Sequence, residues 1–165
     1  MSGADDRRPG ASPACYLDEA DAAYAGYLPA SELAGILNRL LEGERAGAKV
    51  GAKMRNEASG ETARALLAEV ARDEARYVAV LSGLLRRLGQ KPSEATGAFR
   101  DKALKIEGEA ARIAFLNRGQ QAVIRMIEET LPRIREDFVH AALSEMLAKH
   151  RANVARCAEF LERGR

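Results

Sequence analysis

The sequence predicts an all-α protein that folds as an antiparallel four-helix bundle. Ala, Leu, Glu and Arg dominate the composition, Trp is absent and β-branched residues are few, a balance that favours helices. Apolar residues recur at alternating spacings of three and four along four long stretches, which is typical of helices that share a continuous core stripe. The lengths of the connections between these stretches then determine how the helices are joined.

The first two predicted helices span residues 31–57 and 61–88. Ser31 is a good N-cap for the first, because its hydroxyl can accept a hydrogen bond from a free backbone N–H of the first turn. Ser59 and Gly60 interrupt the stripe between the two helices. Such a short turn predicts a helical hairpin, which Gly89 ends by supplying the left-handed residue after the last turn.

A long connection follows, from Gln90 to Gly108, and it includes a short predicted helix around residues 99–106. When fully extended, roughly 19 residues reach about 60 Å, whereas the preceding helix is only about 42 Å long. We therefore expect the connection to cross from one end of the bundle to the other. The helices on its two sides would then run parallel.

The last two predicted helices span residues 109–130 and 137–163. Pro132 ends the first of them, because proline lacks a backbone N–H and cannot continue a helix. Asp137 is the expected N-cap of the second. This short turn predicts a second hairpin.

One domain is expected, with residues 1–15 as a disordered leader and residues 16–165 as the bundle domain. The 26 basic and 24 acidic residues give a net charge of +2, which argues against a nucleic-acid partner. No apolar run is long enough to cross a membrane, and the N-terminus lacks an apolar signal core. The sequence therefore predicts a cytoplasmic protein without a membrane partner.

One face of the helix over residues 31–57 consists of small residues, namely Gly43, Ala46, Gly47, Ala48, Gly51 and Ala52. Glycine in a helix interior costs about 1 kcal/mol relative to alanine, so such a face suggests close approach by another helix. That helix belongs either to the same chain or to a second copy. Packing within the bundle is the default, because Gly47 and Gly51 lie on the core stripe, and a homodimer is the expected assembly. The sequence does not predict any other protein partner.

Four polar residues interrupt the four stripes: Glu44, Glu74, Gln120 and His150. Glu44, Glu74 and His150 each follow the start of their helix by the same interval, roughly 20 Å at about 1.5 Å per residue. They can therefore share one layer of the bundle. Buried polar groups are costly unless they satisfy one another or bind something.

Two segments in these hairpins, LLEGERAGA (Leu40–Ala48) and ARDEARYVAVL (Ala71–Leu81), resemble the ferritin-like superfamily. A bacterial branch of that superfamily with a degenerate di-metal carboxylate motif shares LNRGQ (Leu116–Gln120) and the LP.I turn (Leu131–Ile134). The resemblance implies a ferritin-like bundle with a long crossover between the second and third helices. It also implies a metal site built from one Glu on the first helix and Glu-x-x-His on the second, with the same pair repeated on the third and fourth helices.

The implied motif is incomplete in this chain. Glu44 and Glu74 match the Glu of the first and second helices, but Tyr77 stands where the second helix should supply His. His150 matches the final His, whereas Leu147 stands where its Glu should be. Gln120 lies near the expected third-helix Glu.

The resemblance thus implies at most one divalent metal ion, with iron, manganese and zinc as the candidates, held by Glu44, Glu74 and His150. Weaker candidates, as ligands or as neighbours that support them, are Tyr77, Gln120 and Asn153. The alternative is that no metal binds and that these residues form a structural network in a non-catalytic helical interaction module. No catalytic residue is predicted, although a degenerate di-metal oxidoreductase is a further alternative.

Overall fold

The computed structural model describes residues 25–164, so the predicted leader at residues 1–15 lies outside the described part of the chain. The described residues form helices and no strand, which confirms the all-α class. The helices are α1 (Ala30–Glu57), α2 (Glu61–Arg87), α3 (Phe99–Leu104), α4 (Glu109–Thr130) and α5 (Asp137–Arg163), with a 3-10 turn at Leu131–Arg133.

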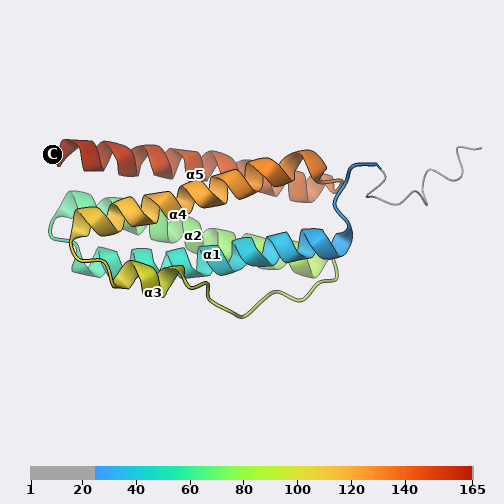
Figure 1. The fold of residues 1–165 in the computed structure, drawn as a ribbon, viewed down its shortest axis with the longest axis horizontal. Coiled ribbons are helices and arrows are strands. Elements are labelled where there is room, and N and C mark those ends of the chain that lie inside the picture. The colour runs from blue at the N-terminus through green and yellow to red at the C-terminus, as the bar shows by residue number, and fades with distance from the viewer. Residues whose placement is uncertain (1–24, 165) are drawn as a thin grey trace, which may run out of the picture.

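The four long helices run along the length of the molecule, and α3 lies beside them (Figure 1). The connection after α2 runs back along the molecule, so α4 starts near the end at which α2 starts, and α2 and α4 run in the same direction (Figure 1). Side-chain contacts agree, because the backbone N–H of Ser59 in the α1–α2 turn donates to the Glu109 carboxylate at 2.9 Å. The connection thus crosses the molecule as its length predicts.

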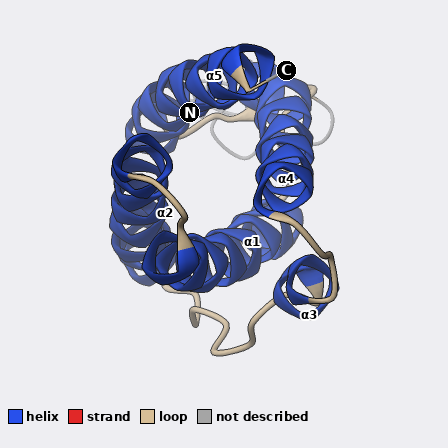
Figure 2. Ribbon diagram, turned by 90° about the vertical axis from the view of Figure 1, so that its left-hand side faces the viewer, coloured by secondary structure: helices blue, strands red, loops and turns tan. Residues whose placement is uncertain are grey.

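Viewed from one end, α1, α2, α5 and α4 form a closed ring, and α3 lies outside it (Figure 2). Contacts join each neighbouring pair in the ring, and α3 contacts both α1 and α4. Each helix therefore turns one face to a shared interior and another to the surface. None of the helices in residues 25–164 is long and apolar enough to cross a membrane.

Side chains of α1 hold the crossing connection in place. The Arg45 guanidinium donates to the carbonyl of Ser93 at 2.9 Å and to that of Ala95. The backbone N–H of Ser93 donates in turn to the Asn38 side-chain oxygen at 2.7 Å. These contacts provide partners for backbone groups that have none within the connection itself.

The predicted N-caps were wrong at two helices. Pro29 occupies the N-cap of α1 and Glu136 that of α5, and neither makes a side-chain capping bond. The observed N-cap lies two residues before the predicted one at α1 and one residue before it at α5, because the Pro29 carbonyl accepts from Leu33 and the Glu136 carbonyl accepts from His140. Gly89 does adopt the predicted left-handed conformation after α2, with φ of 69°.

Two of the small residues of α1 face α2. A Cβ atom built at Gly51 would lie 3.1 Å from the Cβ of Ala71, and one at Gly47 would collide with the Glu74 side chain. Close packing within the chain therefore explains these two glycines, and the homodimer stays a prediction.

Candidate functional site

Polar residues divide the core into two apolar clusters. One cluster is represented by Leu37, Leu81 and Leu143, and the other by Met54 and Leu67. Along each long helix a buried polar residue stands where one cluster gives way to the other; these residues are Glu44, Glu74, Gln120 and His150. We call these four residues the polar layer. The structure buries all four, as the interruption of each stripe predicts.

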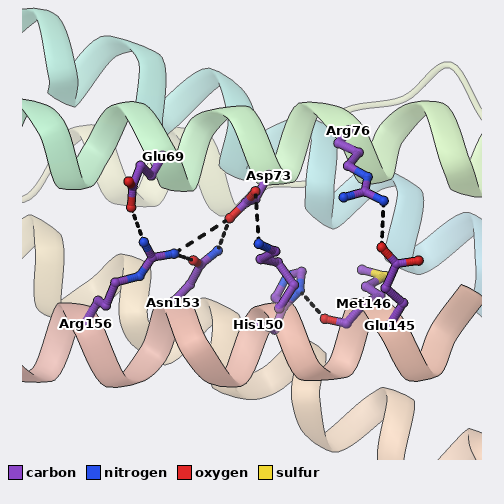
Figure 3. Close-up of polar contacts among 9 residues, drawn as sticks. Glu69, Asp73, Arg76, Glu145, Met146, His150, Asn153 and Arg156 are labelled. Atoms are coloured by element: carbon purple, nitrogen blue, oxygen red, sulfur yellow. Dashed lines mark hydrogen bonds and ion pairs between the residues drawn. The ribbon is translucent and has the colours of Figure 1, made fainter.

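The centre of the polar layer is a buried pair between α1 and α5. Glu44 Oε1 lies 3.1 Å from His150 Nε2, and the two side chains are 0% and 1% exposed. The other ring nitrogen of His150, Nδ1, is held at 3.1 Å from the carbonyl of Met146 (Figure 3). A carbonyl oxygen can only accept a hydrogen bond, so Nδ1 carries the N–H that it accepts, and Nε2 faces the carboxylate.

The charges of this pair follow from its surroundings. Burial lowers the pKa of His150, but the hydrogen bond and the charge of Glu44 raise it, and the net shift is upward. Burial raises the pKa of Glu44, although the His150 contact opposes this shift. When the imidazole is protonated and the carboxylate is ionised, His150 Nε2 donates to Glu44 Oε1. The pair is then neutral overall, as a buried pair needs to be.

Glu74 lies in the same layer but outside this pair. It is 4% exposed, and its carboxyl has no hydrogen-bond partner among the described residues. Burial, followed by the negative charges of Glu44 and Asp73, raises its pKa well above the ordinary value of 4.5. Glu74 is therefore neutral over a pH range in which an exposed glutamate is ionised.

Three buried oxygen atoms of the polar layer and of Tyr77 have no hydrogen-bond partner among residues 25–164. They are Glu44 Oε2, the Tyr77 hydroxyl and Gln120 Oε1. The Tyr77 ring lies close to the imidazole, with 5.8 Å between the ring centroid and that of His150. Glu44 Oε2 is therefore an unused oxygen atom of the pair itself, and a buried polar atom without a partner is costly.

The side chains of Gln120 and Asn153, the remaining weaker candidates, form hydrogen bonds with residues outside the Glu44–His150 pair. The Gln120 amide donates to the sulfur of Cys157 at 3.9 Å. Burial raises the pKa of that thiol to about 11, so it is protonated at neutral pH and is not a thiolate ligand. The Asn153 amide donates to the Asp73 carboxylate at 3.1 Å, away from the Glu44–His150 pair.

Asp73 and Asn153 belong to a chain of polar contacts that joins α2 to α5 (Figure 3). Its outer members, Arg156 and Glu69, are 40% and 46% exposed. The Arg156 guanidinium donates to the Asn153 side-chain oxygen at 2.6 Å and also contacts Glu69. Asp73 is next to Glu74 in sequence but lies off the core stripe, about 100° around the helix. The stripe pattern therefore does not identify Asp73, even though its charge reaches the layer.

The two positions that depart from the implied metal motif are occupied by buried side chains. Tyr77 is 1% exposed and Leu147 is 8% exposed, and both pack in the apolar cluster that includes Leu37. Within residues 25–164, no three His, Cys, Asp or Glu side chains are arranged so that they could bind a metal ion together. A third ligand for the Glu44–His150 pair would require the Glu74 carboxyl to turn toward it.

Replacing Gly47 by alanine tests how tightly Glu74 is packed. An added Cβ would lie 1.9 Å from Glu74 Oε2, so the carboxyl has to move aside, and we expect this to outweigh the helix preference of alanine and to lower the free energy of unfolding by up to about 1 kcal/mol. Gly43→Ala is the matched control on the same helix, since nothing lies within 4 Å of its added Cβ. It should raise that free energy by up to about 1 kcal/mol. Urea denaturation measures both, and a stabilising Gly47→Ala would contradict the packing.

The family described as "Domain of unknown function (DUF6306)" matches residues 31–159, a span that includes the whole polar layer. No curated protein and no solved structure matches the chain.

Proposed function

We propose, for a chain that belongs to the DUF6306 family of domains of unknown function, that its polar layer binds one divalent metal ion inside a ferritin-like four-helix bundle. The ligands are Glu44, Glu74 and His150, and the ion is iron, manganese or zinc. One observation carries the proposal, namely the buried contact of 3.1 Å between Glu44 Oε1 and His150 Nε2. The two hairpins and the crossing connection support the ferritin-like arrangement (Figure 1).

The orientation of His150 supports this role. Metal-binding imidazoles usually donate their second N–H to a carbonyl or a carboxylate, as His150 Nδ1 does to the Met146 carbonyl. Loss of the Nε2 proton would leave a lone pair directed at the same place as the Glu44 carboxylate. Two ligand atoms that each lie about 2.1 Å from a metal ion are roughly 3.0–3.4 Å apart when the ligand–metal–ligand angle is between about 90° (octahedral) and about 109° (tetrahedral). The observed separation falls in that range.

Glu74 would complete the ligand set and the charge balance. It is the only other carboxyl of the polar layer, and it has no hydrogen bond within the described residues that would have to break. Below the raised pKa values of His150 and Glu74, and with Glu44 ionised, the metal-free layer holds one negative and one positive charge. With metal, two carboxylates offset the two positive charges and the imidazole is neutral. The buried layer is therefore uncharged overall in both states, which limits the cost of desolvation.

A second ion is not expected, because Tyr77 and Leu147 replace a histidine and a glutamate of the intact motif. Leu147 offers no donor atom, and the Tyr77 hydroxyl is protonated because burial raises its pKa. Oxygen activation at a di-iron site needs both ions. We therefore propose metal binding without oxidase turnover.

Metal analysis of protein purified without a metal-affinity resin tests this proposal. Titration with Mn(II), Fe(II) or Zn(II) should saturate at one ion per chain, and Fe(II) in air should oxidise no faster than in buffer. His150→Gln should lower the affinity at least tenfold, whereas His140→Gln should not change it, because His140 is the only other histidine and is exposed. Binding that survives in His150→Gln, or two ions per chain, would contradict the ligand set.

The alternative function is a non-catalytic interaction module in which the layer only stabilises the fold. One observation favours it, because a protonated His150 already satisfies Glu44 Oε1 without any ion. In that case none of the three metals would bind, yet the ligand variants would still be less stable than the wild type.

A further inference from the structure

A cavity of about 200 Å³ lies between α1 and α4 and reaches the polar layer. Two of the residues that line it are exposed, Arg39 on α1 and Ala122 on α4, so the cavity opens to solvent beside them. The buried part of its lining includes Glu74 and Gln120 of the polar layer. The cavity is therefore a slot with an outer end at the surface and an inner end in the core.

The slot extends along α1 from Arg39 to Gly47, which are roughly 12 Å apart along the helix axis. The Glu74 carboxyl lies at the Gly47 end, because a Cβ atom built at Gly47 would be 1.9 Å from Glu74 Oε2. Of the described residues that line the slot, Arg39 and Glu74 are the ionisable ones, and most of the slot's length separates them. The outer end therefore carries a positive charge, and the inner end belongs to the polar layer.

The walls between the two ends are apolar. Val123 and Met126 line the slot from α4, and Gly43 lines it from α1 without filling it, since nothing lies within 4 Å of a Cβ built there. The Phe99 ring of α3 lies against Gly119 and borders the slot, and Figure 2 shows α3 beside α1 and α4. Such walls suit an unbranched aliphatic chain, which would be removed from water there.

The charge at the outer end favours an anion. Arg45 on the same helix is bonded to the crossing connection, whereas Arg39 makes no hydrogen bond or ion pair with any residue in 25–164. A guanidinium group matches a carboxylate through two parallel hydrogen bonds, and it repels a cation. A carboxylate at the opening would also keep part of its contact with water, because Arg39 is exposed.

The inner end requires a hydrogen-bond donor. Gln120 Oε1 is buried without a partner among the described residues, and the amide nitrogen of the same side chain already donates to Cys157. A ligand hydroxyl would donate to Gln120 Oε1. A hydroxyl can also accept from a protonated Glu74 or donate to an ionised one, so this recognition is the same in either state of that carboxyl.

We propose that the slot binds an aliphatic carboxylate of about six carbons that carries a hydroxyl group at its far end. The carboxylate pairs with Arg39, the chain lies against Val123 and Met126, and the hydroxyl donates to Gln120. Apolar cavities of about 150 Å³ accommodate benzene, so this cavity has room for a chain of this size. The inference goes beyond the proposed metal function and does not require a bound metal.

An NMR titration of the ¹⁵N-labelled, full-length protein without added metal tests the inference, with 6-hydroxyhexanoate as the probe. The backbone amide signals of Gly43 and Gly119 should shift, and binding should saturate. Hexanoate lacks the hydroxyl and should bind at least threefold more weakly, because one buried hydrogen bond is lost. Hexane-1,6-diol lacks the charge and should also bind about threefold more weakly. No binding of 6-hydroxyhexanoate, or equal binding of the cationic 6-aminohexan-1-ol, would overturn the inference.

Two variants test the two ends of the slot separately. Arg39→Gln should remove the preference for 6-hydroxyhexanoate over the diol, whereas Arg125→Gln should not, because Arg125 is exposed on α4 but does not line the cavity. Gln120→Met should remove the preference for 6-hydroxyhexanoate over hexanoate. If both preferences survive in these variants, the ligand binds elsewhere and the inference is wrong.

A third variant separates the slot from the proposed metal site. Gly43→Leu fills the slot without touching a proposed metal ligand, so it should abolish binding of 6-hydroxyhexanoate and leave metal binding unchanged. Gly35→Leu is its matched control, since Gly35 also has open space on α1 but does not line the cavity. His150→Gln should weaken only metal binding, because His150 does not line the cavity either. Binding of 6-hydroxyhexanoate that persists in Gly43→Leu would overturn the inference, whatever the result for the metal.

Discussion

Replacing His150 by leucine is expected to lower the free energy of unfolding of the metal-free protein by about 3–5 kcal/mol. The substitution leaves the Glu44 carboxyl in the core without its partner, and breaking one side of a buried ion pair typically costs this much. Both side chains are at most 1% exposed, so water cannot replace the lost contact. Urea denaturation near neutral pH measures the change.

The double variant Glu44→Leu, His150→Leu is the decisive control. Removing both charges replaces the pair by apolar side chains, so most of the lost stability should return. His140→Leu, on the exposed face of the same helix, should change the free energy of unfolding by less than about 0.5 kcal/mol. If His150→Leu alone cost less than about 1 kcal/mol, the Glu44–His150 pair would not exist in solution.

The second large effect is on metal affinity, which should rise about a hundredfold for each unit increase in pH. The rise is expected where Glu44 is ionised while His150 and Glu74 are protonated. Binding then displaces two protons, one from His150 Nε2 and one from Glu74, and each displaced proton contributes a factor of about ten per pH unit. Zn(II) titrations at several pH values in this range measure the slope. Glu74→Gln should reduce it to about tenfold, and a wild type with that smaller slope would exclude Glu74 as a ligand.

The free energy of unfolding of the metal-free protein should fall as the pH rises, whereas the metal affinity should increase. The pKa values of His150 and Glu74 are both raised, so the folded state binds more protons than the unfolded state. The contribution of His150 is complete below its ordinary value of 6.5 and disappears as pH rises through its folded pKa. That of Glu74 is complete below 4.5 and disappears in the same way. Saturating Zn(II) should reverse this loss of thermal stability above neutral pH.

The sequence by itself determined the helices and the faces that they bury. Apolar spacing of three and four is a local property of a helix, so the bounds of α4 and α5 agree with the prediction. The same periodicity placed Glu44, Glu74, Gln120 and His150 toward the interior, where the structure has them. The length of the connection, together with the length of α2, was enough to predict that it crosses the molecule.

Only the tertiary structure decided which of these side chains meet. Glu44 pairs with His150, whereas Glu74 lies against Gly47 and forms no hydrogen bond with that pair, and Gln120 turns to Cys157. Periodicity determines the buried face of each helix, but the rotation and axial offset between two helices depend on how all their side chains pack. A difference of one or two ångströms in that offset separates a hydrogen-bonded pair from two unpartnered groups. A cavity beside Glu74 has the same origin, because residues of α1, α2, α3 and α4 all line it.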